Sequence, residues 1–391
     1  MILALLDAIF GLVLSGEGFV WSLWEPFDSA LKTGRLHSAE LLSYLLSGSN
    51  PRWAFEAADV SFGHGDSGHI CRSTMASMNP HRRQFLKSAT VGTAMMSLPD
   101  RSGGDPSGLF PGFQTRRVAT SGAEINLVTA GSGPPLLLLH GFPESHVSWH
   151  KIAPRLAKRF TVVAPDLRGY GDSSKPPDGE NHTNYSKRAM VLDQIEMMRT
   201  MGFDRFAVVG HDRGGRVAWR LAVEHPEVAT QVAVLDIVPD HYSSVTREFA
   251  TAYFHWFFLI QPSPFPEQLI AGNPEAFLRR FLPASYIAPE AMAEYLRCFR
   301  DPLTIHAACE DYRAGATIDL VHGKETRGRR LKSPLLVLWG ERSTIARLYD
   351  VRKVWREQGS DIRGKAMPAG HHLAEELPEQ TLAELMAFLH S

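Results

Sequence analysis

The sequence predicts an α/β fold with a mainly parallel, doubly wound sheet, and two observations support this. From about residue 113 onward, short apolar runs alternate with segments of helical periodicity, as expected for parallel strands joined by crossover helices. Polar residues suited to catalysis directly follow several of these runs: His140, Asp166, Asp212 and Asp236. Because ligands bind at the carboxyl ends of parallel strands, we expect the functional site there.

The expected strands are of two kinds. The first two, at 113–120 and 124–130, alternate polar and apolar residues and are predicted to be half-buried. The others are mostly continuous apolar runs, which are typical of strands covered on both faces. They occupy 136–139, 161–165, 206–209, 232–236 and 334–339, and a short strand is expected around 364–367.

Helical periodicity fills the intervals between strands and one long insertion. The expected helices in the intervals include 187–201, 349–358 and 378–390. Between about 240 and 330 the strand pattern stops, and 249–260 and 289–309 look helical. We therefore predict a core in 109–240 and 332–391, with 241–331 forming an inserted helical cap over the site.

Residues 1–108 predict a poorly ordered N-terminal extension, because they show no sustained period. Their first apolar run, at 1–14, is interrupted by Asp7 and is too short to cross a membrane. We therefore expect no stable membrane span.

A segment at about 79–98 resembles a twin-arginine export signal. Its Arg-Arg pair is followed by Gln-Phe-Leu-Lys and by a run of small and apolar residues. Since such signals stand at an N-terminus, we expect translation to start at Met75 or Met78, with 1–74 untranslated, and the protein to be exported to the periplasm. The alternative is a chance Arg-Arg pair in a cytoplasmic protein.

The composition argues against a nucleic-acid partner and against a metal centre. Lys and Arg number 41 and Asp and Glu 42, for a net charge of −1, whereas nucleic-acid binding requires a basic surface. The three cysteines, Cys71, Cys298 and Cys309, show neither metal-ligand spacing nor a disulfide framework. We expect them to be ordinary buried residues, and no metal or organic cofactor is expected.

The most informative motif is Gly210-His211-Asp212-Arg213-Gly214, which lies between an apolar strand and a helical pattern. Strand, sharp turn and helix in this order are the setting of the G-x-S-x-G nucleophile elbow of α/β-hydrolases, but Asp212 takes the place of serine. A carboxylate is already ionised at neutral pH and forms an ester that water can cleave. The motif therefore predicts a nucleophile for carbon–halogen bonds or epoxides, ahead of esters and peptides.

Turnover of an aspartyl ester requires a base that activates water and an acid that orients the base. The base should follow the last strand, where Gly370 precedes His371, and His372 is its only close rival. For the acid, Asp236 ends a strand and is favoured over Glu341, which follows Trp-Gly. The structural alternatives are a solvated surface histidine and an N-capping aspartate.

Arg213 and Arg216 begin the helix after the nucleophile and share one face of it. Since guanidinium groups bind carboxylates in a bidentate manner, the pair predicts a clamp for a small anionic substrate. The alternative is that one or both arginines form structural salt bridges. The backbone N–H groups of Phe142 and Arg213 are expected to form the oxyanion hole that stabilises the intermediate when water attacks the ester.

Several segments between residues 111 and 391 resemble the fluoroacetate (haloacetate) dehalogenase family of the α/β-hydrolases. They are His140-Gly-Phe-Pro-Glu144, Gly210-His-Asp-Arg-Gly-Gly-Arg216, Val234-Leu-Asp-Ile-Val-Pro239, Phe254-His-Trp256 and Cys309-Glu-Asp-Tyr-Arg-Ala-Gly315. The resemblance implies an Asp212 nucleophile, a His371 base with Asp236 as its partner, and a homodimer. It also implies hydrolysis of 2-haloacids such as fluoroacetate or chloroacetate to 2-hydroxy acids.

By the same resemblance, His255, Trp256 and Tyr312 form the halide pocket. Their imidazole N–H, indole N–H and phenol O–H are donors able to converge on a departing halide. Without the resemblance, His255 and Trp256 would be interpreted as part of an aromatic core stripe. The segment 278–287 lacks the tryptophan-bearing stretch expected of the family, so dehalogenation is a firmer expectation than specificity for fluoride.

Two other functions remain open. An epoxide hydrolase shares the Asp212 nucleophile and needs cap tyrosines to protonate the epoxide oxygen. Those available are Tyr253, Tyr286, Tyr295 and Tyr312. The arginine pair disfavours this function because most epoxides are neutral. A non-catalytic binding protein would have no need of an intact nucleophile, acid and histidine.

Overall fold

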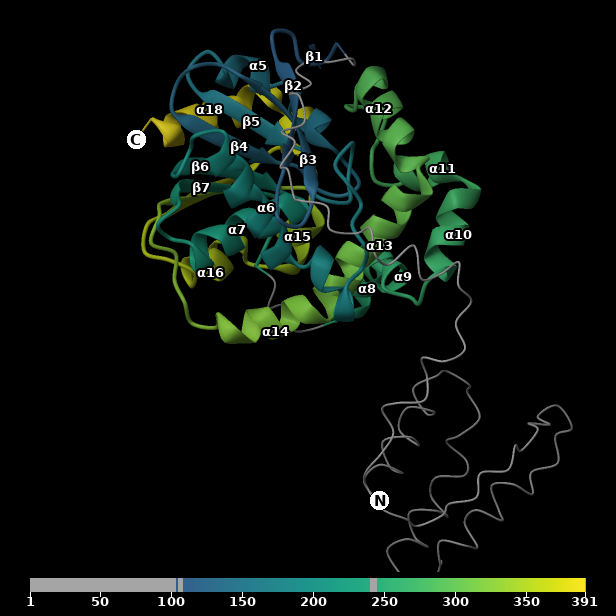
Figure 1. The fold of residues 1–391 in the computed structure, drawn as a ribbon. Coiled ribbons are helices and arrows are strands. Elements are labelled where there is room, and N and C mark those ends of the chain that lie inside the picture. The colour runs from purple at the N-terminus through teal and green to yellow at the C-terminus, as the bar shows by residue number, and fades with distance from the viewer. Residues whose placement is uncertain (1–102, 105–107, 240–244, 391) are drawn as a thin grey trace, which may run out of the picture. The chain divides into compact units, whose positions relative to one another are not determined.

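The computed structural model describes residues 103–104, 108–239 and 245–390 (Figure 1). At their centre is a nine-stranded sheet with the order β1-β2-β3-β5-β4-β6-β7-β8-β9. The strands are β1 (Gly103–Gly104), β2 (Gln114–Ala119), β3 (Glu124–Ala130), β4 (Pro135–Leu139), β5 (Thr161–Pro165), β6 (Phe206–His211), β7 (Ala229–Leu235), β8 (Leu335–Gly340) and β9 (Ile362–Met367).

The sheet is antiparallel at one edge and parallel over the rest of its width. The pairs β1–β2, β2–β3 and β3–β5 are antiparallel, while the described strands from β5 to β9 in sheet order run parallel. Every residue of β6 is buried, whereas β2 keeps half of its residues exposed. The prediction of an α/β fold with a mainly parallel sheet is therefore confirmed.

Helices connect the parallel strands and cover the sheet (Figure 1). Outside the interval between β7 and β8 they are η1 (His146–Trp149), α5 (Ala153–Leu156), η2 (Glu180–Tyr185), α6 (Lys187–Thr200), α7 (Asp212–Glu224), α15 (Thr344–Leu348), α16 (Val351–Arg356), α17 (Leu373–Glu376) and α18 (Pro378–Leu389). Helix α7 packs on β6 and β7 and against α6, which fixes the start of α7 at the carboxyl end of the central strand.

The interval between β7 and β8 contains only helices among its described residues, drawn in green in Figure 1. We call this segment the helical insertion. It comprises α8 (Arg247–Ala252), α9 (Phe254–Leu259), α10 (Phe265–Gly272), α11 (Pro274–Arg279), α12 (Pro289–Phe299), α13 (Pro302–Ala316) and α14 (Ile318–Glu325).

Two helices expected in the insertion are interrupted in the structure. The segment 249–260 divides at Tyr253 into α8 and α9. The segment 289–309 divides before Pro302, because proline favours the first position of a helix and disrupts its interior. The Asp301 side chain caps the new helix by accepting a hydrogen bond from the N–H of Leu303 at 2.9 Å.

Some expectations concern residues outside the described ranges. The twin-arginine-like segment, both proposed start codons and Cys71 lie there. Strand β1 lies within the segment assigned to the extension and pairs with β2. Cys298 and Cys309 are buried free thiols, as expected. No helix in the described ranges combines the length and hydropathy needed to cross a bilayer.

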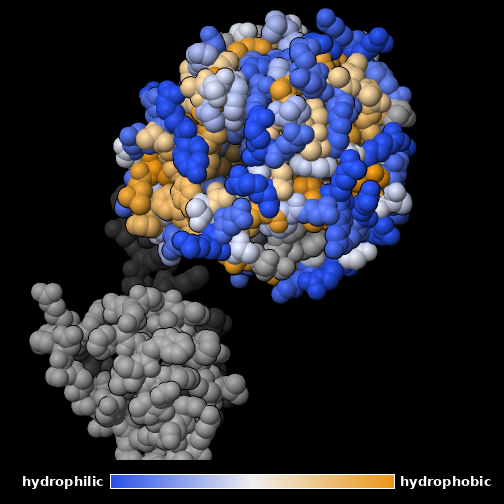
Figure 2. Space-filling model, turned by 180° about the vertical axis from the view of Figure 1, so that it is seen from behind, coloured by the Kyte–Doolittle hydropathy of each residue, from blue (hydrophilic) through white to orange (hydrophobic). Residues whose placement is uncertain are grey.

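Figure 2 shows the surface from behind, with hydrophilic residues over most of this face and apolar residues gathered at its left. The insertion contributes exposed apolar side chains through α9 and α10, including those of Phe257, Phe265 and Leu269.

Candidate active site

The turn between β6 and α7 holds Asp212 in a conformation that few residues adopt. Its φ is +46°, in the left-handed region, where strained residues often occur at functional sites. The flanking glycines allow this turn. A Cβ atom on Gly210 would lie 2.3 Å from the carbonyl oxygen of Gly214, and one on Gly214 would lie 2.3 Å from that of His140.

The Asp212 carboxylate points toward two groups from distant parts of the chain. Its Oδ1 accepts a hydrogen bond from the N–H of Phe142 at 3.1 Å, and its Oδ2 lies 3.8 Å from Nε2 of His371. Burial alone would raise the pKa of Asp212, but the charges of His371 and His211 and the Phe142 N–H lower it below the usual value. Asp212 is therefore ionised at neutral pH.

His371 is held by Asp236. Its Nδ1 lies 2.6 Å from Oδ2 of Asp236, and the other carboxylate oxygen accepts a hydrogen bond from the N–H of Gly340 at 2.9 Å. Burial favours neutral imidazole, but the hydrogen bond and charge of Asp236 outweigh it and raise the pKa of His371 to about 9. Glu341, the alternative acid, has an exposed side chain.

His372, the rival base, faces a different set of groups. Its Nδ1 lies 3.1 Å from the hydroxyl of Tyr286, and its Nε2 lies 3.9 Å from Oε1 of Glu144. Burial lowers the pKa of His372 to about 3. The geometry therefore brings His371, and not His372, between the two carboxylates of Asp212 and Asp236.

The loop that presents the Phe142 N–H is fixed by His140. The N–H of Leu167 donates to Nε2 of His140 at 2.9 Å, so the ring proton must reside on Nδ1, which donates to the carbonyl oxygen of Gly141 at 2.8 Å. Burial lowers the pKa of His140, which keeps the ring neutral. His140 thus ties two strand-end loops together.

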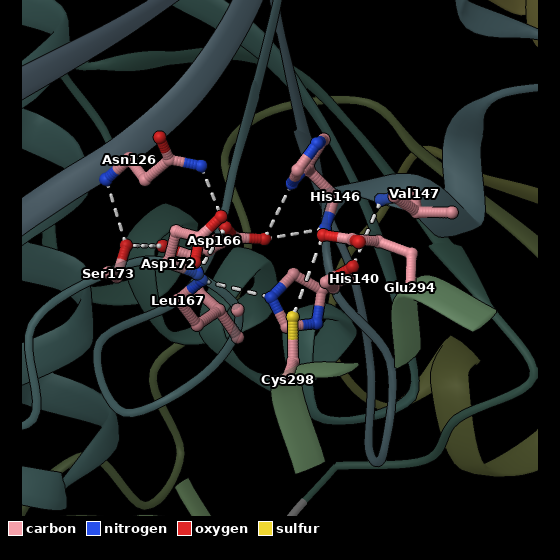
Figure 3. A network of polar contacts seen from close by, with 12 residues as sticks. Asn126, His140, His146, Val147, Asp166, Leu167, Asp172, Ser173, Glu294 and Cys298 are labelled. Carbon is pink, nitrogen blue, oxygen red and sulfur yellow. Dashed lines mark hydrogen bonds and ion pairs between the residues drawn. The ribbon is translucent and has the colours of Figure 1, made fainter. Parts of the chain in front are cut away.

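Asp166 has a structural role in the same region (Figure 3). Its carboxylate accepts hydrogen bonds from Nδ2 of Asn126 at 2.9 Å, the N–H of His146 at 2.8 Å and the N–H of Asp172 at 2.9 Å. Burial raises its pKa, but the charge of His146 and the hydrogen bonds from its ring and backbone N–H lower it below the ordinary value. This polar residue at a strand end therefore stabilises loops and does not reach Asp212.

Arg213 connects α7 to the insertion. Its Nη2 donates to Oδ1 and to the carbonyl oxygen of Asp311, both at 2.6 Å, and its guanidinium carbon lies 4.1 Å from the ring centroid of Tyr312. Burial would raise the pKa of Asp311, but Arg213 and Lys187 lower it to about 2. The salt-bridge alternative thus applies to Arg213, while its substrate contact stays a prediction.

Arg216 is also buried, on the same face of α7. Its guanidinium carbon lies 4.6 Å from the ring centroid of Trp256, a distance suited to a cation–π interaction. Both arginines of the predicted clamp are therefore stacked on aromatic rings of the insertion.

His255, Trp256 and Tyr312 come together beside Phe142. The His255 ring is stacked on Phe142 with centroids 6.0 Å apart, and Tyr312 lies 5.7 Å from His255 and 6.3 Å from Trp256. Burial lowers the pKa of His255 to about 3, so the ring is neutral at pH 7 with one N–H donor. Nδ1 of His255 has no hydrogen-bond partner among the described residues. Burial also raises the pKa of Tyr312, which keeps its hydroxyl protonated.

Comparison with known proteins places the chain in a family. Residues 134–376 match the model of the alpha/beta hydrolase fold. The chain belongs to the α/β-hydrolase fold family. A fluoroacetate dehalogenase from Burkholderia sp is 44% identical over 289 residues, which cover 72% of this chain and 95% of that relative. The predicted resemblance to the haloacetate dehalogenases is thereby confirmed, and the protein is a hydrolase.

This α/β-hydrolase is also similar to an epoxide hydrolase and to a solved structure of the same fold family. A soluble epoxide hydrolase from Corynebacterium sp. (strain C12) is 33% identical over 279 residues, covering 68% of this chain and 94% of that relative. The crystal structure of a Nostoc sp PCC 7120 protein assigned to the alpha/beta hydrolases is 55% identical, covers 71% of this chain and 98% of that chain, and has a TM-score of 0.70.

Two features of this α/β-hydrolase were not found by sequence reasoning. One is Asp311, the counter-ion of Arg213. The sequence signal that could have revealed it is a carboxylate in the middle of a buried helix, since buried charges require partners. The other is Glu144, whose Oε2 lies 2.9 Å from Nδ1 of His211. Nε2 of His211 in turn donates to the carbonyl oxygen of His371 at 3.0 Å, so Glu144 and His211 support the segment that carries His371.

One group of the hydrolase outside this site has the composition of a metal site. Ligand atoms of Asp178, His306 and Glu310 lie within 4.8 Å of one another. However, the two ring nitrogens of His306 lie 2.8 Å from Asp178 and 3.0 Å from Glu267. Burial lowers the pKa of His306, but these carboxylates outweigh it and raise the pKa overall. In this structure the group is therefore an ion-pair network, with both ring nitrogens of His306 facing carboxylates.

Proposed function

We propose that the protein is a hydrolytic dehalogenase that converts 2-haloacids such as fluoroacetate or chloroacetate to 2-hydroxy acids. The observation that carries the proposal is an ionised Asp212 at the elbow, flanked by the buried cations Arg213 and Arg216. An anionic substrate suits this charge arrangement. The identity of 44% to a fluoroacetate dehalogenase supports the same activity.

In the first step, the arginines hold the substrate carboxylate and Oδ2 of Asp212 attacks the adjacent carbon. Nη2 and Nε of Arg213 both face Asp311, which leaves Nη1 for the substrate. A carbon–oxygen bond forms as the carbon–halogen bond breaks, and the halide leaves with the electron pair. Donors on His255, Trp256 and Tyr312 stabilise the charge as it develops on the halogen.

In the second step, His371 removes a proton from water, and the resulting hydroxide attacks the ester carbonyl of Asp212. The negative charge then builds up on Oδ1, which already accepts the Phe142 N–H; we assign the second donor to the N–H of Arg213. As the intermediate collapses, the bond between the carbonyl carbon and Oδ2 breaks, the product leaves with Oδ2 and takes the proton from His371, and the oxygen from water completes the restored carboxylate. Ester formation removes the carboxylate charge beside His371. Its pKa must therefore fall from the free-enzyme value of about 9, so the ring releases its proton to solvent and becomes a base only after the first step.

Epoxide hydrolysis is the second candidate, and the placement of two phenols favours it. The ring of Tyr312 lies 5.0 Å from that of Phe142, whose N–H binds Asp212, and the ring of Tyr253 lies 5.9 Å from that of His255. Two phenols near the nucleophile are the acids that opening of an epoxide requires. Tyr286 and Tyr295 are less suited, since their hydroxyls contact His372 and Glu375.

A product assay separates the two activities. Purified full-length protein is given fluoroacetate, chloroacetate or styrene oxide, and halide and diol are measured over time. We expect halide release that falls by roughly 10³-fold or more in Asp212→Asn and Asp212→Ala. Diol formation without halide release would instead establish the epoxide hydrolase.

A further inference from the structure

An open hollow of about 600 Å³ lies on the surface where α8, the end of α11 and α15 meet. Six residues line it: Arg247, Glu248, Thr251, Ala252, Arg280 and Arg347. All three arginine side chains are exposed. Arginine keeps its positive charge at every physiological pH, so this surface is cationic regardless of conditions.

Two residues that line the hollow are followed directly in sequence by residues that pack against the active site. Ala252 lines the hollow, and the next residue, Tyr253, has its ring 5.9 Å from that of His255. Arg280 lines the hollow, and the next residue, Phe281, packs on His255 at 4.9 Å. The same two stretches of chain therefore form both the wall of the hollow and the wall of the proposed halide pocket.

The positive charge of Arg280 acts on groups inside the site. Its guanidinium carbon lies 5.7 Å from the ring centroid of Phe254, which directly precedes His255. Arg280 is also one of the positive charges that, together with the larger effect of burial, lower the pKa of His255. An anion in the hollow would thus be within electrostatic range of the site.

Positive charge prevails in the hollow. Glu248 is the one carboxylate among its lining residues, and it lies 3.6 Å from Nε of Arg347. Three guanidinium groups against one carboxylate leave an excess of two positive charges. The whole chain carries a net charge of −1, so this is a local field and not a property of the protein as a whole.

We propose that this arginine hollow is an entry site that collects small carboxylate anions and passes them to Arg216 and Arg213. The inference rests on the proposed function, because it assumes an anionic substrate. Concave cationic surfaces raise the local concentration of anions by about 10–10³-fold, and the effect weakens as salt increases. The hollow therefore favours anions over neutral molecules, and the site then reacts only with anions that carry a bond Asp212 can break.

Steady-state kinetics on Arg247→Gln, Arg280→Gln, Arg347→Gln and the triple variant test this role. At low ionic strength we expect the triple variant to raise KM for chloroacetate by about tenfold with kcat nearly unchanged. The dependence of KM on salt should flatten in the same variant. Replacement of the three arginines by lysine retains the charge and should retain most of the wild-type KM.

Arg159→Gln is the matched control. Arg159 is exposed and precedes β5 at the amino ends of the parallel strands, away from the site. This variant removes one positive charge at the amino ends of the strands, opposite the site, and should leave KM and its salt dependence unchanged.

Binding measurements keep this inference separate from the dehalogenase proposal. Calorimetry of chloroacetate binding to Asp212→Asn, with and without the triple substitution, requires no turnover. Weaker binding in the triple variant would support the entry site even if wild-type protein released no halide. An active wild type whose KM, salt dependence and chloroacetate affinity are all indifferent to the three arginines would overturn it.

Discussion

At the scale of single residues, the charge of His371 depends on the state of Asp212. The two side chains lie 3.8 Å apart, and a carboxylate at this distance favours the imidazolium ion. With a pKa of about 9, His371 is protonated in the free enzyme at neutral pH. In the mechanism that we propose, the histidine therefore pairs with the charged Asp212 carboxylate first and acts as a base later.

We predict that Asp212→Asn lowers the pKa of His371 below its wild-type value of about 9, because the amide is neutral like the ester. The measurement is an NMR titration of the His371 ring in both proteins. Asp236→Asn should lower the same pKa as well, since it removes the hydrogen-bonded charge. A His371 pKa that is equal in wild type and Asp212→Asn would contradict the proposed order of steps.

At the scale of elements, the elbow depends on close contact between the start of α7 and the loop after β4. A Cβ atom on Gly214 would lie 2.3 Å from the carbonyl oxygen of His140, and backbone on both sides resists movement. Gly323, in the middle of α14, has nothing within 4 Å of such an atom.

We predict that Gly214→Ala lowers the free energy of unfolding by roughly 1–3 kcal/mol or more, because a Cβ overpacks the elbow. Gly323→Ala should stabilise the protein by about 0.5–1 kcal/mol, because alanine favours a helix more than glycine does. Urea unfolding of the two variants beside wild type measures both. Equal stability of Gly214→Ala and wild type would show that the elbow tolerates a side chain.

Prediction from sequence succeeded where local pattern decides the element. The continuous apolar runs of β4 and β6 indicated buried strands. The glycine and the acid that follow the second run predicted that Asp212 lies in the turn between a strand and a helix. It failed at Pro302, where one periodic stretch becomes two helices. Asp311 was missed because its partner, Arg213, is about a hundred residues away in sequence, and local periodicity carries no information on such a contact.

At the scale of the whole molecule, the raised pKa of His371 makes stability depend on pH. Its folded pKa of about 9 lies above the ordinary value of about 6.5 for histidine. The folded state therefore binds the proton more tightly than the unfolded state. This contribution is complete below about pH 6.5 and is lost as the pH rises through about 9.

We predict that the free energy of unfolding falls by roughly 2 kcal/mol more between pH 6.5 and 9.5 in wild type than in His371→Gln. This change in free energy is reduced to allow for solvent screening, because the His371 side chain is 33% exposed. Urea unfolding at several pH values measures the difference. Parallel pH profiles for the two proteins would contradict the assigned pKa.

Asp311 has a consequence for how molecules reach the nucleophile. It is buried on α13 and forms ion pairs with Lys187 at the start of α6 and Arg213 at the start of α7. Any swing of the insertion that carried α13 away would break both ion pairs and leave the buried cations Lys187 and Arg213 without their carboxylate, at a cost of about 3–5 kcal/mol. Helix α13 is thus a fixed wall and not a moving lid. The side of the site that α13 forms, through Tyr312 against Phe142 and His255, therefore keeps its shape as small molecules come and go.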